Sequence, residues 1–175
     1  MARAELGDSV AARKAPLVRV AHSDDAAEVL RLAYGMWRDF GMEPEAGDWE
    51  AAYHTEFVDA TGRGDLRVMV VDDPDQPGRL ISCGAAWVYR LLPAPWLANG
   101  KMGFLQWFYT EPSWRGRGVA TAVAEACLVW LDKQGCTRVQ LHAAPRAEEV
   151  YRRLGFAEGH YRNMWLQLPK AAPPD

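Results

Sequence analysis

A loop with two glycines, placed between an apolar segment and a long helical pattern, is the feature that most constrains this chain. Residues 114–120 have the sequence WRGRGVA. The preceding segment, FLQWFYT at 104–110, is bulky and aromatic as strands are, and Glu111-Pro112 ends it. The sequence therefore predicts a strand, a glycine loop and a helix in direct succession, because apolar side chains recur after the loop at helical spacing, at Val119, Val123, Ala126, Cys127 and Trp130.

The start of a helix after a glycine loop is suited to bind an anion. The first backbone N–H groups of a helix have no intrahelical partner, and the aligned peptide dipoles make that end partly positive. Gly116 and Gly118 lack a Cβ atom, so the loop can adopt positive φ angles and come close to a ligand. Arg115 and Arg117 add positive charge beside them. A phosphate group is the expected ligand.

Two well-known phosphate-binding sequences are excluded by individual positions. A dinucleotide-binding loop requires a third glycine where this chain has Thr121, which argues against a dinucleotide-dependent oxidoreductase. A nucleotide phosphate loop requires Gly-Lys followed by Ser or Thr, and this loop lacks that sequence. A tight turn without any ligand stays open as the alternative.

Two motifs in the correct order resemble those of the GNAT superfamily of N-acyltransferases. Residues 115–120, RGRGVA, resemble its acyl-CoA signature, Arg/Gln-x-x-Gly-x-Gly/Ala, and residues 147–156, AEEVYRRLGF, resemble its second motif, a short helix that carries a tyrosine. The resemblance extends from Leu17 to Leu168. It implies an α/β fold with a mixed, mostly antiparallel central sheet flanked by helices. It also implies an enzyme that transfers an acetyl group from acetyl-CoA, a thioester of coenzyme A, to an amine.

The resemblance assigns the acyl-CoA site to the loop and to the strand before it. Backbone N–H groups of the loop would bind the pyrophosphate, and the strand, which splays away from its neighbour in this family, would pair with the pantetheine arm. One position departs from the family pattern, because Ala144 stands where many members have Asn or Ser. The residues implied for the cofactor are Phe108, Tyr109, Thr110, Arg115, Gly116, Arg117, Gly118, Val119, Ala120 and Thr121.

Tyr151 is the residue expected to act as the general acid. It stands four residues before Gly155, in the position of the family's tyrosine. A phenol with a pKa near 10 is protonated at neutral pH and can donate a proton to a departing thiolate. The alternative is that Tyr151 only packs in the core, on the same helix face as Ala147 and Leu154.

The sequence does not identify the general base. Family members often have an acidic residue on the strand before the loop, where this chain offers Gln106, whose amide cannot take a proton. Asp39, Glu43 and Glu45 follow the first helix, but each alone is more commonly a solvated surface residue. His142 is a weaker candidate, because a histidine on an alternating strand commonly has a structural role.

Aromatic residues indicate the side of the cleft that accepts the acetyl group. Trp37, Trp87 and Trp107, together with Gln106, fall on elements expected to border that side. Aromatic walls hold cationic or planar amines well. Core packing explains these tryptophans equally well and stays open as the alternative.

Charge and cysteine content limit the classes of partner. The net charge of −3 gives no general attraction to nucleic acid or to an anionic membrane. Cys83, Cys127 and Cys136 have neither disulfide nor zinc spacing, which favours a reducing cytoplasm, and Cys127 is expected to fill the core. Residues 1–16 contain no apolar stretch typical of a signal peptide. We expect no metal; the resemblance implies a homodimer, which is common in such families.

Turn and helix signals give the order β-α-α-β-β-β-α-β-α-β along the chain. A single acetyltransferase domain is expected at 17–168, with an N-terminal arm at 1–16 and a tail at 169–175. The last strand is expected at 160–168. The second helix, at 48–60, is expected to bury Ala51, Ala52, Phe57 and Val58.

These features together predict an acetyl-CoA-dependent N-acetyltransferase. The expected acceptor is a primary amine of a small molecule, and the expected reaction is direct attack in a ternary complex, since no Cys/His or Ser/His arrangement is evident. One alternative is an enzyme that acetylates a protein N-terminus or a lysine. Another is a regulatory module that binds acyl-CoA without turnover.

Overall fold

A five-stranded sheet forms the centre of the molecule. The computed structural model describes residues 16–160 and 163–168. The sheet has the order β1-β2-β3-β4-β5, in which the first four strands are antiparallel and β5 is parallel to β4. The expected α/β fold with a mixed, mostly antiparallel sheet is therefore confirmed. The strands are β1 (Val18–Val20), β2 (Leu66–Asp72), β3 (Leu80–Arg90), β4 (Lys101–Thr110) and β5 (Val139–Leu141).

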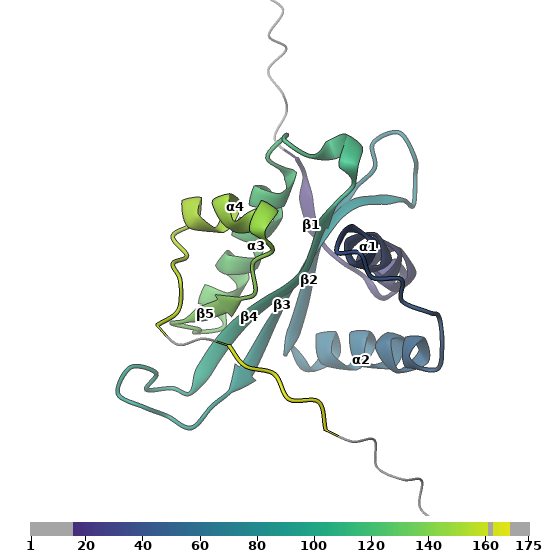
Figure 1. Cartoon of the computed structure of the whole chain (residues 1–175). Coiled ribbons are helices and arrows are strands. Elements are labelled where there is room, and N and C mark those ends of the chain that lie inside the picture. Colours follow the sequence, from purple (N-terminus) through teal and green to yellow (C-terminus); the bar gives the residue numbers. More distant parts are fainter. Residues whose placement is uncertain (1–15, 161–162, 169–175) are drawn as a thin grey trace, which may run out of the picture.

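Four helices cover the two faces of this sheet. Helices α1 (Ala26–Asp39) and α2 (Trp49–Arg63) lie on one face, and α3 (Val119–Lys133) and α4 (Glu148–Arg153) lie on the other (Figure 1). Short 3-10 turns precede α1, α3 and α4, at Ser23–Asp25, Pro112–Trp114 and Pro145–Ala147. Within the described ranges, no helix combines the length and the apolar character that a bilayer span requires.

The central strands are apolar on both sides because both faces of the sheet are covered. In β2, Leu66, Val68 and Val70 belong to the core beneath α1 and α2, whereas Met69 and Val71 belong to the core beneath α3. This double burial explains why β2 is continuously apolar from Val68 to Val71 instead of alternating over those residues.

A β-bulge interrupts β4 at Trp107 and Phe108. Cys83 pairs with Tyr109 and Ala85 pairs with Gln106, so two residues of β4 stand opposite Gly84 alone. Trp107 has a φ of 56°, and it is the one non-glycine residue with a positive φ in the part of the chain that the structure describes. Such backbone conformations are strained and concentrate at functional sites.

The parallel pair β4 and β5 separates after a short contact. Gly103, Phe104 and Leu105 pair with Val139, Gln140 and Leu141. Beyond Leu105, β4 continues to Thr110 paired with β3 and no longer with β5. From residue 106 onward, the edge of β4 that faces β5 has no strand partner among the described residues. The expected splay of this strand is therefore present.

Two expectations about the ends of the domain and the second helix are corrected. The strand expected at 160–168 is absent over the described residues 163–168, where Met164 and Trp165 are 89% and 83% exposed. Its apolar alternation is insufficient, because a strand also needs a neighbouring backbone, and this segment is hydrogen-bonded through a side chain, from Asn163 to His142. Residues 1–15 and 169–175, which contain most of the expected arm and the expected tail, lie outside the described residues.

In α2, the buried residues are Phe57 and Ala60, and Tyr53 is half-buried. Ala51, Ala52 and Val58, which were expected inside, are exposed. The helix instead turns its aromatic side chains, spaced four residues apart from Trp49 to Phe57, toward the sheet, because these rings bury more apolar area than alanine does.

Candidate active site

The glycine loop leads into an uncapped helix start, as the sequence predicts. Gly116 and Gly118 have φ angles of 70° and 80°, which favour glycine strongly. Gly118 is the N-cap of α3, and no side chain caps this end. The N–H groups of the first turn, from Val119 to Thr121, are therefore available to an anion. A Cβ atom built on either glycine would meet no described atom within 4 Å, so the loop borders open space.

A cavity of about 350 Å³, called here the loop cavity, lies beside this helix start. It contains every predicted cofactor residue except Arg117, whose guanidinium lies 4.8 Å from the ring centre of Trp114 instead. Arg146 and Arg153, which the sequence reasoning missed, add two further cations to its wall; Arg146 directly precedes the second motif and Arg153 lies within it. The predicted residues that line the loop cavity are Phe108, Tyr109, Thr110, Arg115, Gly116, Gly118, Val119, Ala120 and Thr121.

Asp39 holds two of these arginines in place. Its carboxylate accepts hydrogen bonds from Arg115 at 2.6 Å and forms an ion pair with Arg146 at 2.7 Å. Arg115 also donates from Nε to the backbone oxygen of Thr110 at 2.8 Å, and its guanidinium lies 5.2 Å from the ring centre of Tyr109. Asp39 is therefore an ion-pair partner on the loop side and does not reach the acceptor side as a free base.

Tyr151 lies on α4 where the loop cavity meets a second cavity. Its side chain is 8% exposed and makes edge-on contacts with Phe108 and Phe156, at ring distances of 6.1 and 5.8 Å. Burial raises the pKa of Tyr151 to about 12, so the phenol is protonated at neutral pH. Tyr151 thus packs in the core, as the alternative expects, and it also borders the loop cavity, as the predicted role of general acid requires.

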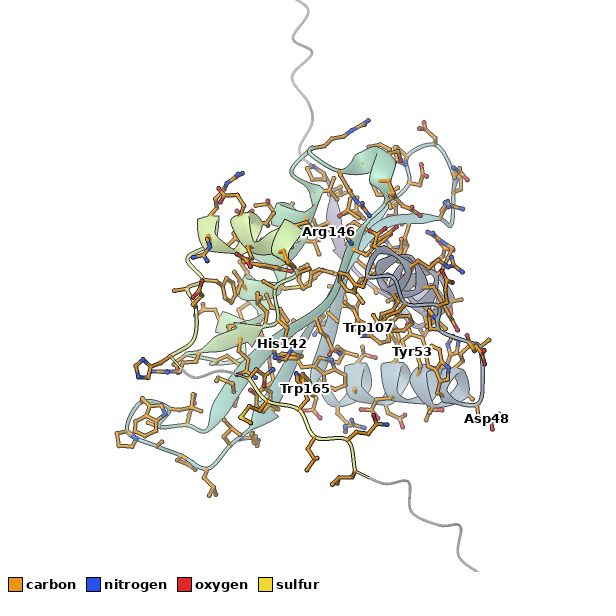
Figure 2. All side chains as sticks on the ribbon, in the orientation of Figure 1. Asp48, Tyr53, Trp107, His142, Arg146 and Trp165 are labelled. Carbon is orange, nitrogen blue, oxygen red and sulfur yellow. The ribbon has the colours of Figure 1, made fainter. Side chains whose placement is uncertain are left out.

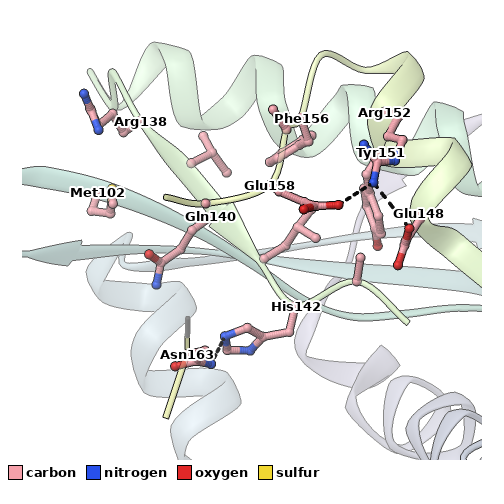
Figure 3. Close-up of a pocket in the computed structure, with 15 residues that line it drawn as sticks. Met102, Arg138, Gln140, His142, Glu148, Tyr151, Arg152, Phe156, Glu158 and Asn163 are labelled. Carbon is pink, nitrogen blue, oxygen red and sulfur yellow. Dashed lines mark hydrogen bonds and ion pairs between the residues drawn. The ribbon is translucent and has the colours of Figure 1, made fainter. Parts of the chain in front are cut away.

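The second cavity, called here the edge cavity, lies between the outer edge of β5 and α4 (Figure 3) and measures about 740 Å³. Its charged residues neutralise one another, since Arg152 pairs with Glu158 at 2.8 Å and with Glu148 at 3.6 Å. His142 lines this cavity and is hydrogen-bonded to Asn163 at 2.7 Å. The structure therefore places His142 apart from the predicted acceptor residues.

A third cavity, called here the aromatic cavity, lies between the sheet and α2 and measures about 450 Å³. It brings together all four predicted acceptor residues, Trp37, Trp87, Gln106 and Trp107. Sequence reasoning missed the contribution of α2, although the four-residue spacing of its aromatic residues was a usable signal. The lining residues from α2 are Trp49, Tyr53, Glu56 and Phe57.

Trp107 stands at the centre of this aromatic cluster. It lies beside Tyr53 of α2 (Figure 2), and the two rings stack at 5.4 Å with an interplanar angle of 21°. Its ring also meets Trp37 edge-on at 5.3 Å. Trp37 in turn meets Trp49 edge-on at 5.7 Å. The Tyr53 hydroxyl donates to the backbone oxygen of Ala26 at 2.8 Å, which fixes α2 against α1. The strained conformation of Trp107 is therefore held from two sides.

Few polar groups line the aromatic cavity. The carboxylate of Glu56 is half-exposed and paired with Arg63 at 3.0 Å, and Gln106 supplies an amide. Glu43 is 84% exposed at its side chain, and neither Glu43 nor Glu45 lines any of the three cavities. No free carboxylate among the described cavity-lining residues is thus available as a base on this side.

The bulge in β4 lies between the residues that line the aromatic cavity and those that line the loop cavity. Successive residues of a regular strand face opposite sides, but Gln106 and Trp107 both line the aromatic cavity because the extra residue shifts the alternation. Phe108 then lines the loop cavity. Trp107 and Phe108, which are neighbours in the sequence, thus line two different cavities. No group of three or more metal-binding side chains occurs among the described residues.

Comparison with protein families gives a match over a segment that contributes to both the loop cavity and the aromatic cavity. The model of the acetyltransferase (GNAT) family matches residues 30–156. This range contains the glycine loop, the bulged strand and the second motif.

Individual proteins agree with this match. The chain is 29% identical over 164 residues to an aminoglycoside N(6')-acetyltransferase type 1 of Stenotrophomonas maltophilia, covering 89% of this chain and 94% of that protein. It is 22% identical over 156 residues to an uncharacterized N-acetyltransferase of Methanocaldococcus jannaschii, covering 87% of this chain and 66% of that protein. A predicted acetyltransferase of Clostridium acetobutylicum, solved with acetyl-CoA, has a TM-score of 0.75 at 22% identity, covering 87% and 95% of the two chains.

Proposed function

The chain belongs to the acetyltransferase (GNAT) family, and we propose that it transfers the acetyl group of acetyl-CoA to a primary amine of a small molecule. The family and the expected acetyl donor, acetyl-CoA, are confirmed by the family match. The identity of the acceptor and the mechanism are our proposals. The observation that carries them is the placement of the loop cavity and the aromatic cavity on either side of one bulge in β4.

The loop cavity has the properties that the phosphates of acetyl-CoA require. Free N–H groups at the start of α3 and the positive φ angles of Gly116 and Gly118 suit a pyrophosphate. Arg115 and Arg146 share the single carboxylate of Asp39, which leaves a surplus positive charge at the wall. Arg153, which also lines the cavity, pairs with Glu149 at 2.9 Å. The free edge of β4 from residue 106 onward offers backbone groups to the pantetheine arm in the manner of an added strand.

The reaction we propose is a direct attack of the amine on the thioester carbonyl. The nitrogen lone pair forms the new C–N bond, and the carbonyl oxygen becomes negative. The nitrogen, now positively charged, releases one proton to solvent, and collapse of this tetrahedral species breaks the C–S bond. Tyr151 donates its phenolic proton to the departing thiolate, since it borders the loop cavity and is protonated at neutral pH. The apolar surroundings of the aromatic cavity favour the neutral amine, which is the form that attacks.

Cys83 is the thiol closest to the bulge, and its properties argue against a covalent acetyl-enzyme. Its Sγ donates to the backbone oxygen of Trp107 at 3.3 Å, and the residue is 1% exposed. Burial raises the pKa of Cys83 to about 12, so the nucleophilic thiolate is scarce at neutral pH. Cys83, Cys127 and Cys136 are all free and buried, which supports our placement of the protein in a reducing cytoplasm.

A small acceptor is favoured over a protein substrate by the volume and the lining of the acceptor site. The aromatic cavity measures about 450 Å³, which is within the size range typical of small-molecule sites, and its walls are largely apolar, as such sites are.

The test is to measure thiol release from acetyl-CoA in the presence of primary amines, amino acids and short peptides, with mass analysis of the products. We expect release that depends on a small amine and yields its amide, with initial rates that follow a sequential pattern. Release with peptides alone would support the protein acetyltransferase, and acetyl-CoA binding without any amine-dependent release would support the binding module. Either result would overturn the proposal.

A further inference from the structure

We infer that the acceptor is a primary amine carried on a flat, apolar body, such as an arylalkylamine, and not a polycationic amino sugar or polyamine. This inference rests on the proposed function and specifies its substrate class. It is carried by the composition of the aromatic cavity, whose walls are dominated by six aromatic side chains.

The rings of the aromatic cavity come from every element around it. Trp37 comes from α1, Trp49, Tyr53 and Phe57 come from α2, and the sheet supplies Trp87 and Trp107. Flat apolar bodies stack against aromatic faces or meet them edge-on, and they lose no hydrogen bonds on leaving water. A sugar ring has several hydroxyl groups that would each need a partner, and these walls offer few.

The charges around the aromatic cavity point in the same direction. Glu56 is the one carboxylate among the residues that line it, and Arg63 already pairs with this group at 3.0 Å. Arg63 also contacts Asp65 at 3.1 Å, so one guanidinium is shared by two carboxylates and the three groups together carry a single net negative charge. A ligand with several ammonium groups would bury charges without partners, which is unfavourable. A ligand with a single amine would not.

The bulge sets the orientation of such a ligand. Gln106 supplies the amide of the cavity wall, and it lies on β4 beside the bulge that leads to the loop cavity. The amine nitrogen therefore points toward β4, where Phe108 faces the loop cavity, and the apolar body lies toward Trp49 and Tyr53 on α2. In this orientation the nitrogen is the group nearest to the acetyl donor.

The test compares two classes of amine in the thiol-release assay. We expect kcat/KM for 2-phenylethylamine and tryptamine to exceed that for spermidine and kanamycin at least tenfold. Calorimetric titration of the protein saturated with coenzyme A gives the same comparison without turnover. A preference for spermidine or kanamycin in both measurements would overturn this inference and leave the acetyltransferase function intact. Release with none of these amines and no amine binding would overturn both.

Variants at the rim of the aromatic cavity test the contact itself. Trp49 lines the cavity and is 37% exposed, so its replacement leaves the core intact. We expect Trp49→Ala to raise KM for tryptamine at least tenfold with KM for acetyl-CoA unchanged, and Trp49→Phe to restore most of the loss. Trp96→Ala is the matched control, since Trp96 is 66% exposed and lines none of the three cavities. Equal KM values for Trp49→Ala and Trp96→Ala would contradict the inference.

Discussion

Replacing Gly118 by alanine should weaken acetyl-CoA binding without blocking folding. Gly118 has a φ of 80° and forms the N-cap of α3 beside the loop cavity. A Cβ atom there meets no described atom within 4 Å, so the protein itself accepts the methyl group. That group instead occupies space in which a pyrophosphate would approach the helix start.

The expected loss follows from the hydrogen bonds at stake. A hydrogen bond to a charged group contributes about 1.5–3 kcal/mol. If the methyl group displaces one phosphate oxygen from one backbone N–H, Kd for acetyl-CoA rises roughly 10- to 150-fold, at about 1.4 kcal/mol for each factor of ten. The positive φ strains alanine in the folded state, whereas alanine also lowers the conformational entropy of the unfolded chain, which partly offsets that strain. The free energy of unfolding therefore falls by about 1 kcal/mol.

Gly64→Ala separates these two effects. Gly64 ends α2 with a φ of 78°, its Cβ position is equally open, and it lines none of the three cavities. Urea denaturation should show a similar loss of about 1 kcal/mol for both variants. Calorimetric titration with acetyl-CoA should show weaker binding for Gly118→Ala only. If both variants bound acetyl-CoA with the affinity of the unmodified protein, the loop cavity would not be the phosphate site.

Three further substitutions test the acid, the thiol and the bulge. Tyr151→Phe should lower kcat about 100-fold or more with little change in KM for acetyl-CoA. Because the folded pKa of Tyr151 is about 12 against an ordinary value of 10, the stability that this phenol contributes is complete below pH 10 and falls as the pH rises from 10 to 12. Denaturation at alkaline pH should show this fall in the unmodified protein and not in Tyr151→Phe. Cys83→Ala should keep kcat within about twofold, and mass analysis of the protein after mixing with acetyl-CoA should find no acetylated chain; a large loss of kcat would point to a covalent route. Gly84→Ala should destabilise the fold by about 1–3 kcal/mol in urea denaturation, because its Cβ would lie 2.6 Å from a ring carbon of Phe108 and 2.8 Å from Cγ1 of Val123; an unchanged midpoint would mean that the bulge tolerates a side chain at this position.

The features that the sequence predicts well are those that depend on neighbouring residues. Glycines at positive φ, the apolar spacing of α3 and the paired motifs are local signals, and they locate the loop cavity and Tyr151 without knowledge of the fold. The predicted acceptor residues also come together at one cavity, and their role there stays a prediction, because core packing explains tryptophans equally well.

The features that it does not predict depend on distant partners. Arg115 lies 76 residues from Asp39, and no local signal shows that this carboxylate restrains the loop arginine. The bulge at Trp107 exists only in register with β3, so the strand sequence alone does not reveal it. The strand expected at 160–168 has the right alternation, yet pairing depends on an adjacent edge. Which face of α2 is buried likewise depends on the sheet, because the sheet accommodates the aromatic side chains of that helix.

The bulge in β4 has a consequence for how such an enzyme diversifies. Gln106 and Trp107 line the cavity proposed for the acceptor, and Phe108 lines the cavity proposed for the donor, so under this proposal adjacent codons control separate recognition tasks. Random change at the first two positions would then alter which amine is taken, while the glycine loop further along the chain stays as it is. A lineage can therefore acquire new acceptors by small steps without passing through a form that has lost its acetyl donor.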